Sequence, residues 1–126
     1  MNYNIIPTEK FLKEDKRLKK KYGSLRDELM EVSNNLSEHP TLGTPLNNTY
    51  EIRIAIKSKG KGKSGGARII TYTITVNEEV YILTIYDKSE FGSIEDGLLT
   101  KIIEGIKQAQ ERIRGSGALI HLSTQF

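Results

Sequence analysis

The chain contains neither cysteine nor tryptophan, and its only histidines, His39 and His121, lie far apart in its 126 residues. Without cysteine, neither a disulfide framework nor a thiolate metal site can form, and two distant histidines do not predict a metal cluster. We therefore expect no structural metal and no cofactor. No long apolar run and no signal-peptide pattern occur, so we expect a soluble, cytoplasmic protein without membrane association.

Net charge is also small, because 19 Lys and Arg residues stand against 16 Asp and Glu residues, a balance of +3. A value this low does not by itself identify a nucleic-acid-binding protein. The distribution is more informative: from Arg53 to Arg68 the chain has six basic residues and no acidic one, whereas residues 75–96 have six acidic residues and a single lysine. A local cluster of positive charge is typical of a surface that binds a polyanion.

The first forty residues predict one strand and two helices. Residues 2–7 favour a short strand that ends at a proline. Thr8 is a suitable N-cap for an amphipathic helix that runs to about Tyr22. Ser24, followed three residues later by Asp27, forms a capping-box pattern that opens a second helix directly after a short turn. Apolar residues at helical spacing support this helix: Leu25, Leu29, Val32 and Leu36.

The middle of the chain alternates between loop and strand patterns. Residues 39–48 are rich in Pro, Gly and Asn, so they predict an irregular connection. In residues 50–57 isoleucines alternate with basic and small residues, which predicts a strand with one core face and one positive face. Residues 57–67 (KSKGKGKSGGA) predict a flexible basic loop, and residues 68–76 and 80–86 predict a hairpin whose strands are covered on both sides.

Residues 93–115 combine a capping-box pattern, Ser93 with Asp96, and an apolar stripe that ends near Gly115, so they predict a third helix. The element order is β-α-α-β-β-β-α. We therefore predict an α+β fold in which a helical hairpin packs on a mainly antiparallel four-stranded sheet, with a C-terminal helix. One domain is expected over residues 1–114, and residues 115–126 form an extension of unknown role.

One short motif suggests nucleotide binding but does not meet its requirements. Residues 62–64 (Gly-Lys-Ser) look like the end of a phosphate-binding GxxxxGK[ST] loop. However, Lys57 stands where the first glycine should be, and a strand rather than a helix follows the motif. We interpret the segment instead as an RNA-binding arm, with a solvated hairpin loop as the alternative. The RNA-binding residues of this arm are Lys57, Lys59, Lys61 and Lys63.

Three further cations are candidates for a catalytic site. Arg53 and Arg68 lie on neighbouring predicted strands and Lys88 follows the next strand, so they are expected to converge on one patch. Such a patch favours binding of a phosphate. The structural alternative is that Arg68 pairs with Asp87 or Glu90 across the sheet.

RNA can be cleaved at such a site without a metal, because the ribose 2′-OH is itself the nucleophile. Arginines would neutralise the charge of the phosphorane-like transition state, while an acid and a base move the two protons. Lys88, Tyr86 and Glu90 are candidates for these two roles, and their assignment stays open.

The runs YEIRIAIKSKGKGKSGGARIITYTI at 50–74 and VYILTIYDKSE at 80–90, with the helical hairpin and the connection PTLGTPL before them, resemble RelE/HigB-like toxins. These are members of the RelE/ParE superfamily in type II toxin-antitoxin systems. The resemblance implies a ribosome-dependent endoribonuclease, an mRNA interferase that blocks translation, held inactive by a cognate antitoxin, here expected to be of helix-turn-helix type. It also implies catalytic roles for Arg53, Arg68 and Lys88.

Two features depart from the family pattern: the basic loop is longer and richer in lysine, and Ile94 stands about where a catalytic tyrosine is expected. Two other functions therefore stay open. ParE-like members share the fold but inhibit DNA gyrase without cutting RNA, and a third alternative is a non-catalytic RNA-binding module.

Overall fold

The computed structural model describes residues 2–60, 65–90 and 96–115. The chain divides into two compact units, residues 1–93 and residues 94–126, and each is described by itself. The single domain expected from the sequence stays a prediction. None of the helices in the described ranges is both long and apolar enough to cross a membrane.

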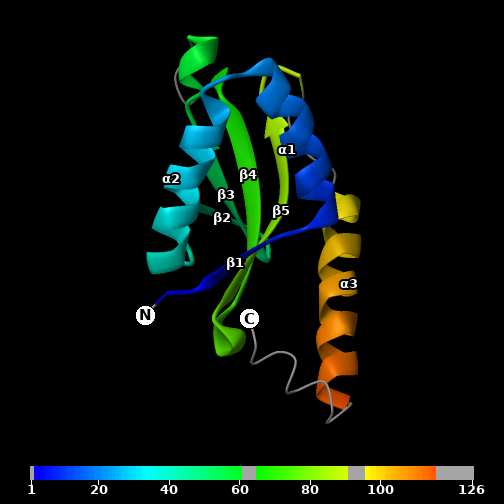
Figure 1. The fold of residues 1–126 in the computed structure, drawn as a ribbon. Coiled ribbons are helices and arrows are strands. Elements are labelled where there is room, and N and C mark those ends of the chain that lie inside the picture. Colours follow the sequence, from blue (N-terminus) through cyan, green and yellow to red (C-terminus); the bar gives the residue numbers. More distant parts are fainter. Residues whose placement is uncertain (1, 61–64, 91–95, 116–126) are drawn as a thin grey trace. The chain divides into compact units, whose positions relative to one another are not determined.

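The first unit is built around one five-stranded sheet (Figure 1). The strand order is β1-β5-β4-β3-β2, with β1 parallel to β5 and every other pair antiparallel. The elements are β1 (Asn4–Pro7), α1 (Glu9–Lys21), α2 (Leu25–Glu38), β2 (Thr44–Leu46), β3 (Thr49–Ile54), β4 (Ala67–Ile74) and β5 (Glu79–Asp87). The predicted α+β fold and mainly antiparallel sheet are confirmed.

One strand was not predicted. Residues 39–48, expected to be a loop throughout, contain β2, which pairs with β3 over three residues. The hairpin between them turns at Asn47, whose φ of 55° lies in the left-handed region that asparagine tolerates. Pro45 is compatible with β2 because β2 is an edge strand, where the missing N–H leaves no ladder bond unmade.

The two helices begin differently. Thr8 caps α1 as predicted, since its side chain accepts a hydrogen bond from the Phe11 N–H at 3.4 Å. The predicted capping box at Ser24 is wrong: Ser24 makes no side-chain capping bond, and its hydroxyl instead donates to Glu28 at 3.1 Å and contacts the Ser58 hydroxyl at 2.9 Å. Ser24 is thus engaged by Glu28 and by the distant Ser58 instead of capping the helix.

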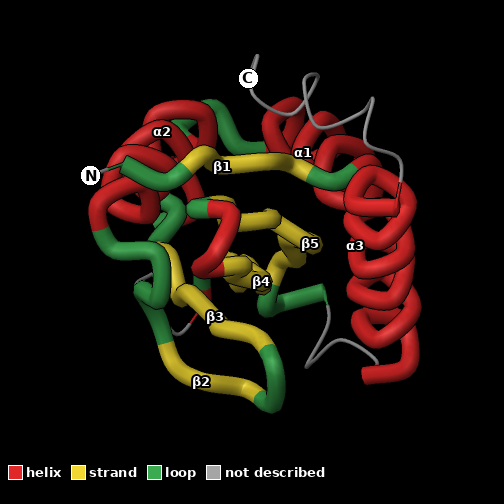
Figure 2. Tube along the Cα trace, turned by 90° about the horizontal axis from the view of Figure 1, so that it is seen from below, coloured by secondary structure: helices red, strands yellow, loops and turns green. Residues whose placement is uncertain are grey.

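The main core lies between the helical hairpin and one face of the sheet, with α1 and α2 on the same side (Figure 2). Sheet residues of this core include Ile52, Ile54, Ile69 and Ile85, and the helices contribute Phe11, Leu18, Leu25 and Leu36. The isoleucines of β3 face the helices, while Arg53 between them is exposed. The predicted core face is confirmed at Ile52 and Ile54, but the strand ends at Ile54, so Lys57, predicted on the basic face, lies in the 3-10 turn Lys57–Lys59 instead.

The second unit contains α3 (Asp96–Gly115), at the place predicted for the third helix. Its apolar residues Leu99, Ile102, Ile103 and Ile106 recur at the spacing of one helical face. The capping position predicted at Ser93 lies outside the described residues.

Gly66, directly before β4, lies very close to the backbone at the end of β3. A Cβ atom at this position would lie 1.9 Å from the Ile54 carbonyl oxygen, a backbone atom. We expect Gly66→Ala to lower the free energy of unfolding by about 3 kcal/mol, because the backbone has to move apart. Urea denaturation measures this loss.

Gly23→Ala is the matched control, because nothing lies within 4 Å of a Cβ atom added at Gly23. We expect this variant to unfold at the wild-type urea concentration or slightly above it. Equal stability of the Gly66 and Gly23 variants would contradict the close approach of the two strands.

Candidate functional site

Three polar side chains form one row across the sheet, on the face opposite the helical hairpin. Arg53 of β3 is the register partner of Arg68 of β4, and Arg68 is the partner of Tyr86 of β5. Directly opposed residues of an antiparallel pair project to the same face with Cβ atoms about 5 Å apart. The structure therefore brings together Arg53 and Arg68, which the sequence predicted to converge.

A carboxylate that the sequence analysis missed lies beside both arginines. Glu51 Oε1 is 3.6 Å from Arg53 Nε and 4.0 Å from Arg68 Nε. Glu51 precedes Arg53 by two residues in β3, so strand alternation alone would have placed it on the arginine face. The two guanidinium groups consequently do not form an isolated pair of like charges.

Exposure differs strongly along the row. The side chain of Arg53 is 60% exposed, whereas that of Arg68 is 5% exposed and also donates to the Ala67 carbonyl oxygen at 3.2 Å. Tyr86 is buried, and burial together with the charge of Glu51 raises the pKa of its phenol, although both arginines oppose this shift. Tyr86 is therefore protonated at neutral pH and available as a hydrogen-bond donor.

Lys88 lies at the same end of the sheet as Arg68 and Tyr86. Its backbone N–H donates to the Gly66 carbonyl oxygen at 3.0 Å, which continues the pairing of β4 and β5 one residue beyond the Ala67–Asp87 pair. The backbone pairing of β4 with β5 therefore holds both catalytic candidates, Arg68 and Lys88, at the same end of these two strands.

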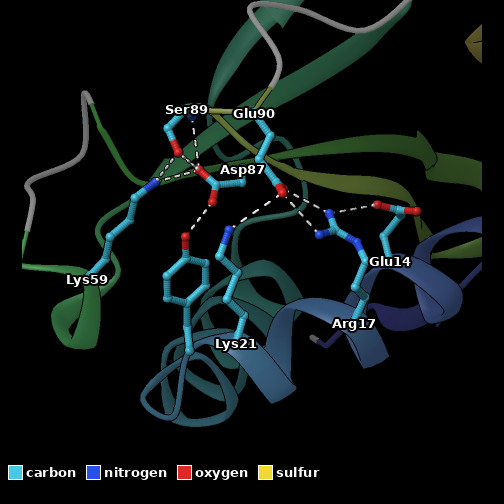
Figure 3. Close-up of polar contacts among 8 residues, drawn as sticks. Glu14, Arg17, Lys21, Lys59, Asp87, Ser89 and Glu90 are labelled. Carbon is cyan, nitrogen blue, oxygen red and sulfur yellow. Dashed lines mark hydrogen bonds and ion pairs between the residues drawn. The ribbon is translucent and has the colours of Figure 1, made fainter.

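Asp87, next to Lys88, is fully buried, and its carboxylate accepts four hydrogen bonds from described residues (Figure 3). The Tyr22 hydroxyl donates to Oδ2 at 2.6 Å, while the Lys59 ammonium, the Ser89 N–H and the Ser89 hydroxyl donate to Oδ1. Burial opposes ionisation, but these donors outweigh it and hold the pKa of Asp87 far below its usual range. A buried carboxylate thus joins the end of α1, the basic loop and the turn after β5.

Glu90 makes a second connection to α1. It accepts hydrogen bonds from both terminal nitrogens of Arg17, at 2.9 and 3.1 Å, and lies 3.5 Å from Lys21 Nζ (Figure 3). The hydrogen bonds from Arg17 lower the pKa of Glu90. Asp87 and Glu90, considered from sequence as partners of Arg68, are therefore engaged by α1 and by Lys59.

The basic loop is anchored at its first residues, which form a short 3-10 turn, Lys57–Lys59. The Lys57 N–H donates to Glu28 at 2.6 Å, and the side chain of Lys59 is only 10% exposed because its ammonium contacts Asp87 and Ser89. Lys59, predicted to bind RNA, is thus engaged in an internal ion pair. Lys61 and Lys63 lie outside the described residues.

Among the residues that the structure describes, no three His, Asp or Glu side chains are grouped closely enough to hold a metal ion. The cations and carboxylates present can bind an anion and transfer protons through their own side chains.

Comparison with known proteins supports the fold. No family model matches the chain. A solved structure of the Escherichia coli toxin RelE, a double Arg-to-Ala mutant in the free state, is similar with a TM-score of 0.53 and 18% sequence identity. The match covers 84% of this chain and 99% of RelE. The chain has a RelE-like fold.

The Asp87 contacts predict a pH-dependent contribution to stability. We expect Asp87→Asn to lower the free energy of unfolding by roughly 3 kcal/mol at pH 7, because Lys59 loses its buried counter-charge. The folded-state pKa of Asp87 lies below the unfolded value of about 3.9, so the ionic stabilisation is present above that pH and is lost as the pH falls. The difference in free energy of unfolding between the wild type and Asp87→Asn should therefore become smaller below pH 4.

Urea denaturation at pH 7 and pH 3 measures both effects. Glu31→Gln, at an exposed carboxylate of α2, is the control and should change stability by less than about 0.5 kcal/mol. If Asp87→Asn lowers the free energy of unfolding by the same amount at both pH values, the charge of the Asp87 carboxylate does not stabilise the fold.

Proposed function

We propose that this protein is the toxin of a type II toxin-antitoxin system and cleaves messenger RNA as a metal-independent, ribosome-dependent endoribonuclease. The observation that carries the proposal is the cross-strand pairing of Arg53 with Arg68 on the sheet face opposite α1 and α2. The RelE-like fold is consistent with it. Ribosome dependence is proposed from the family resemblance of the sequence alone.

The proposed reaction uses the RNA's own 2′-OH. The 2′ oxygen attacks the adjacent phosphorus, the bond from phosphorus to the 5′ oxygen breaks, and a 2′,3′-cyclic phosphate and a 5′-OH result. Arg53, the exposed end of the row, binds the phosphate, and Arg68 behind it neutralises the charge that develops in the transition state.

Proton transfer is assigned from the positions of the side chains and, for Tyr86, from its protonation state. Glu51 is the proposed acceptor for the 2′ proton, since its carboxylate lies beside both arginines. Tyr86, whose raised pKa keeps its phenol protonated, is a proposed donor to the leaving 5′ oxygen, and Lys88 is a second one. Lys57, Lys61 and Lys63 stay our candidates for further RNA contacts, whereas Lys59 is proposed to hold the loop through Asp87.

An antitoxin, expected to be of helix-turn-helix type, is the proposed partner that blocks this activity. A DNA segment carrying a toxin of this kind is expected to encode it beside the toxin gene.

Arg53→Ala tests the phosphate-binding role. We expect it to slow mRNA cleavage in a coupled translation reaction by roughly 100-fold, because a preorganised cation at the transition state is lost. Arg53 is largely exposed, so the variant should fold normally. Arg26→Ala, at an exposed arginine of α2, is the matched control and should cleave at the wild-type rate.

Undiminished cleavage by Arg53→Ala would remove this residue from the mechanism. The same wild-type protein is added to a DNA supercoiling reaction with purified gyrase. Inhibition of gyrase without any mRNA cleavage would assign the protein to the ParE-like alternative.

Glu51→Gln tests the proton acceptor. We expect a loss of at least about 100-fold in cleavage, because the amide keeps the shape of the carboxylate but cannot take a proton. Binding of an uncleavable RNA with 2′-O-methyl riboses should stay within twofold of the wild type. Equal rates for Glu51→Gln and the Glu31→Gln control would exclude Glu51 as the base.

A further inference from the structure

The outer side of α1 carries a cationic hollow that lies outside the row of Arg53, Arg68 and Tyr86. Five residues line it, all of them basic: Lys13, Lys16, Arg17, Lys20 and Lys21. They occur at three- and four-residue spacings, which bring side chains together on one side of a helix. The opposite side of α1 contributes Phe11 and Leu18 to the core.

Ion pairs neutralise only part of this charge. Arg17 contacts Glu14 and Glu90, Lys21 contacts Glu90, and Lys13 is 3.9 Å from Glu9 in a largely exposed pair. Lys16 and Lys20 are exposed, and neither has an ion-pair partner in the described part of the chain. Since like charges this close repel one another, the face is more stable when an anion binds there.

The contacts of Glu90 also order part of the hollow before any ligand binds. Two hydrogen bonds fix the guanidinium of Arg17, and the same carboxylate holds the Lys21 ammonium nearby (Figure 3). Holding flexible cationic side chains in place lowers the entropy lost on binding.

We propose that this cationic face of α1, defined by its five lining residues, binds the phosphodiester backbone of a nucleic acid independently of base sequence. A protein partner is disfavoured by the lining, because protein interfaces centre on buried aromatic and aliphatic anchors and this hollow has none. A phosphate chain requires only cations, each of which releases a condensed counterion when it binds.

The surface is linked to the candidate catalytic site through one short turn. Glu90, which holds Arg17 and Lys21, follows Lys88 by two residues. A strand bound at the Lys88 end of the sheet would therefore find further cations on α1. Binding by this face does not depend on cleavage, so it is testable even if the proposed nuclease activity is absent.

The test is the double substitution Lys16→Ser/Lys20→Ser, which leaves in place the ion pairs that α1 makes among the described residues. Binding of fluorescent 20-nucleotide RNA and DNA strands of one sequence is measured by anisotropy over a series of KCl concentrations, with 2′-O-methyl RNA to prevent cleavage. We expect weaker binding of the RNA, the DNA or both. The slope of log K against log[KCl] should fall in magnitude by about 1.4, because each of the two lost phosphate contacts contributes about 0.7.

Lys101→Ser/Lys107→Ser is the matched control, because it removes the same charge from exposed positions of α3. It should keep the wild-type slope, and both variants should keep the wild-type thermal unfolding midpoint. The strand that the α1 variant binds more weakly, RNA or DNA, is the nucleic acid whose backbone this face binds. An unchanged slope in the α1 variant, or an equal change in the control, overturns the proposal. Tighter binding of polyglutamate than of either nucleic acid, lost in the α1 variant, would also overturn it.

Discussion

β4 is hydrogen-bonded to β3 on one side and to β5 on the other, and the register of these two ladders determines which side chains share a face. Burial of Ile69 and its neighbours beneath α1 and α2 holds that register, because a slip of one residue would move every side chain of the strand to the opposite face. Arg68 would then enter the core. The polar row on one face thus depends on hydrophobic packing on the other.

Helix α1 connects this sheet to the remaining charged groups. Its inner side packs in the core, its last turn leads to the Tyr22 hydroxyl that binds Asp87, and its outer side carries the cationic face. Asp87 and Glu90 are the two acidic residues that the sequence analysis gave as the alternative partners of Arg68. Both are engaged by α1 or Lys59, whereas Glu51 lies beside Arg53 and Arg68. The fold resembles that of a toxin at 18% identity, so the function proposed for this chain depends on these particular side chains.

Much of the fold was predictable because its signals are local and periodic. The three-to-four spacing of apolar residues predicted α1 and α2, and the alternation in residues 50–57 predicted both the strand and the outward direction of Arg53. The candidate site was predictable only in part. Convergence of Arg53 and Arg68 followed from strand adjacency, but Glu51 was overlooked although the same alternation places it on their face.

The sequence by itself determined the helices, most of the strands and the separation of isoleucine and arginine faces in β3, because each depends on the period of one segment. Only the tertiary structure decided the partners of residues distant in the chain. Lys59 belongs to a glycine-lysine run that looks like a free arm, yet its ammonium is drawn to a carboxylate 28 residues away. Ser24 likewise bonds to Ser58 rather than forming a local cap. Such pairs arise from strand register and chain path, which the composition of a single segment does not contain.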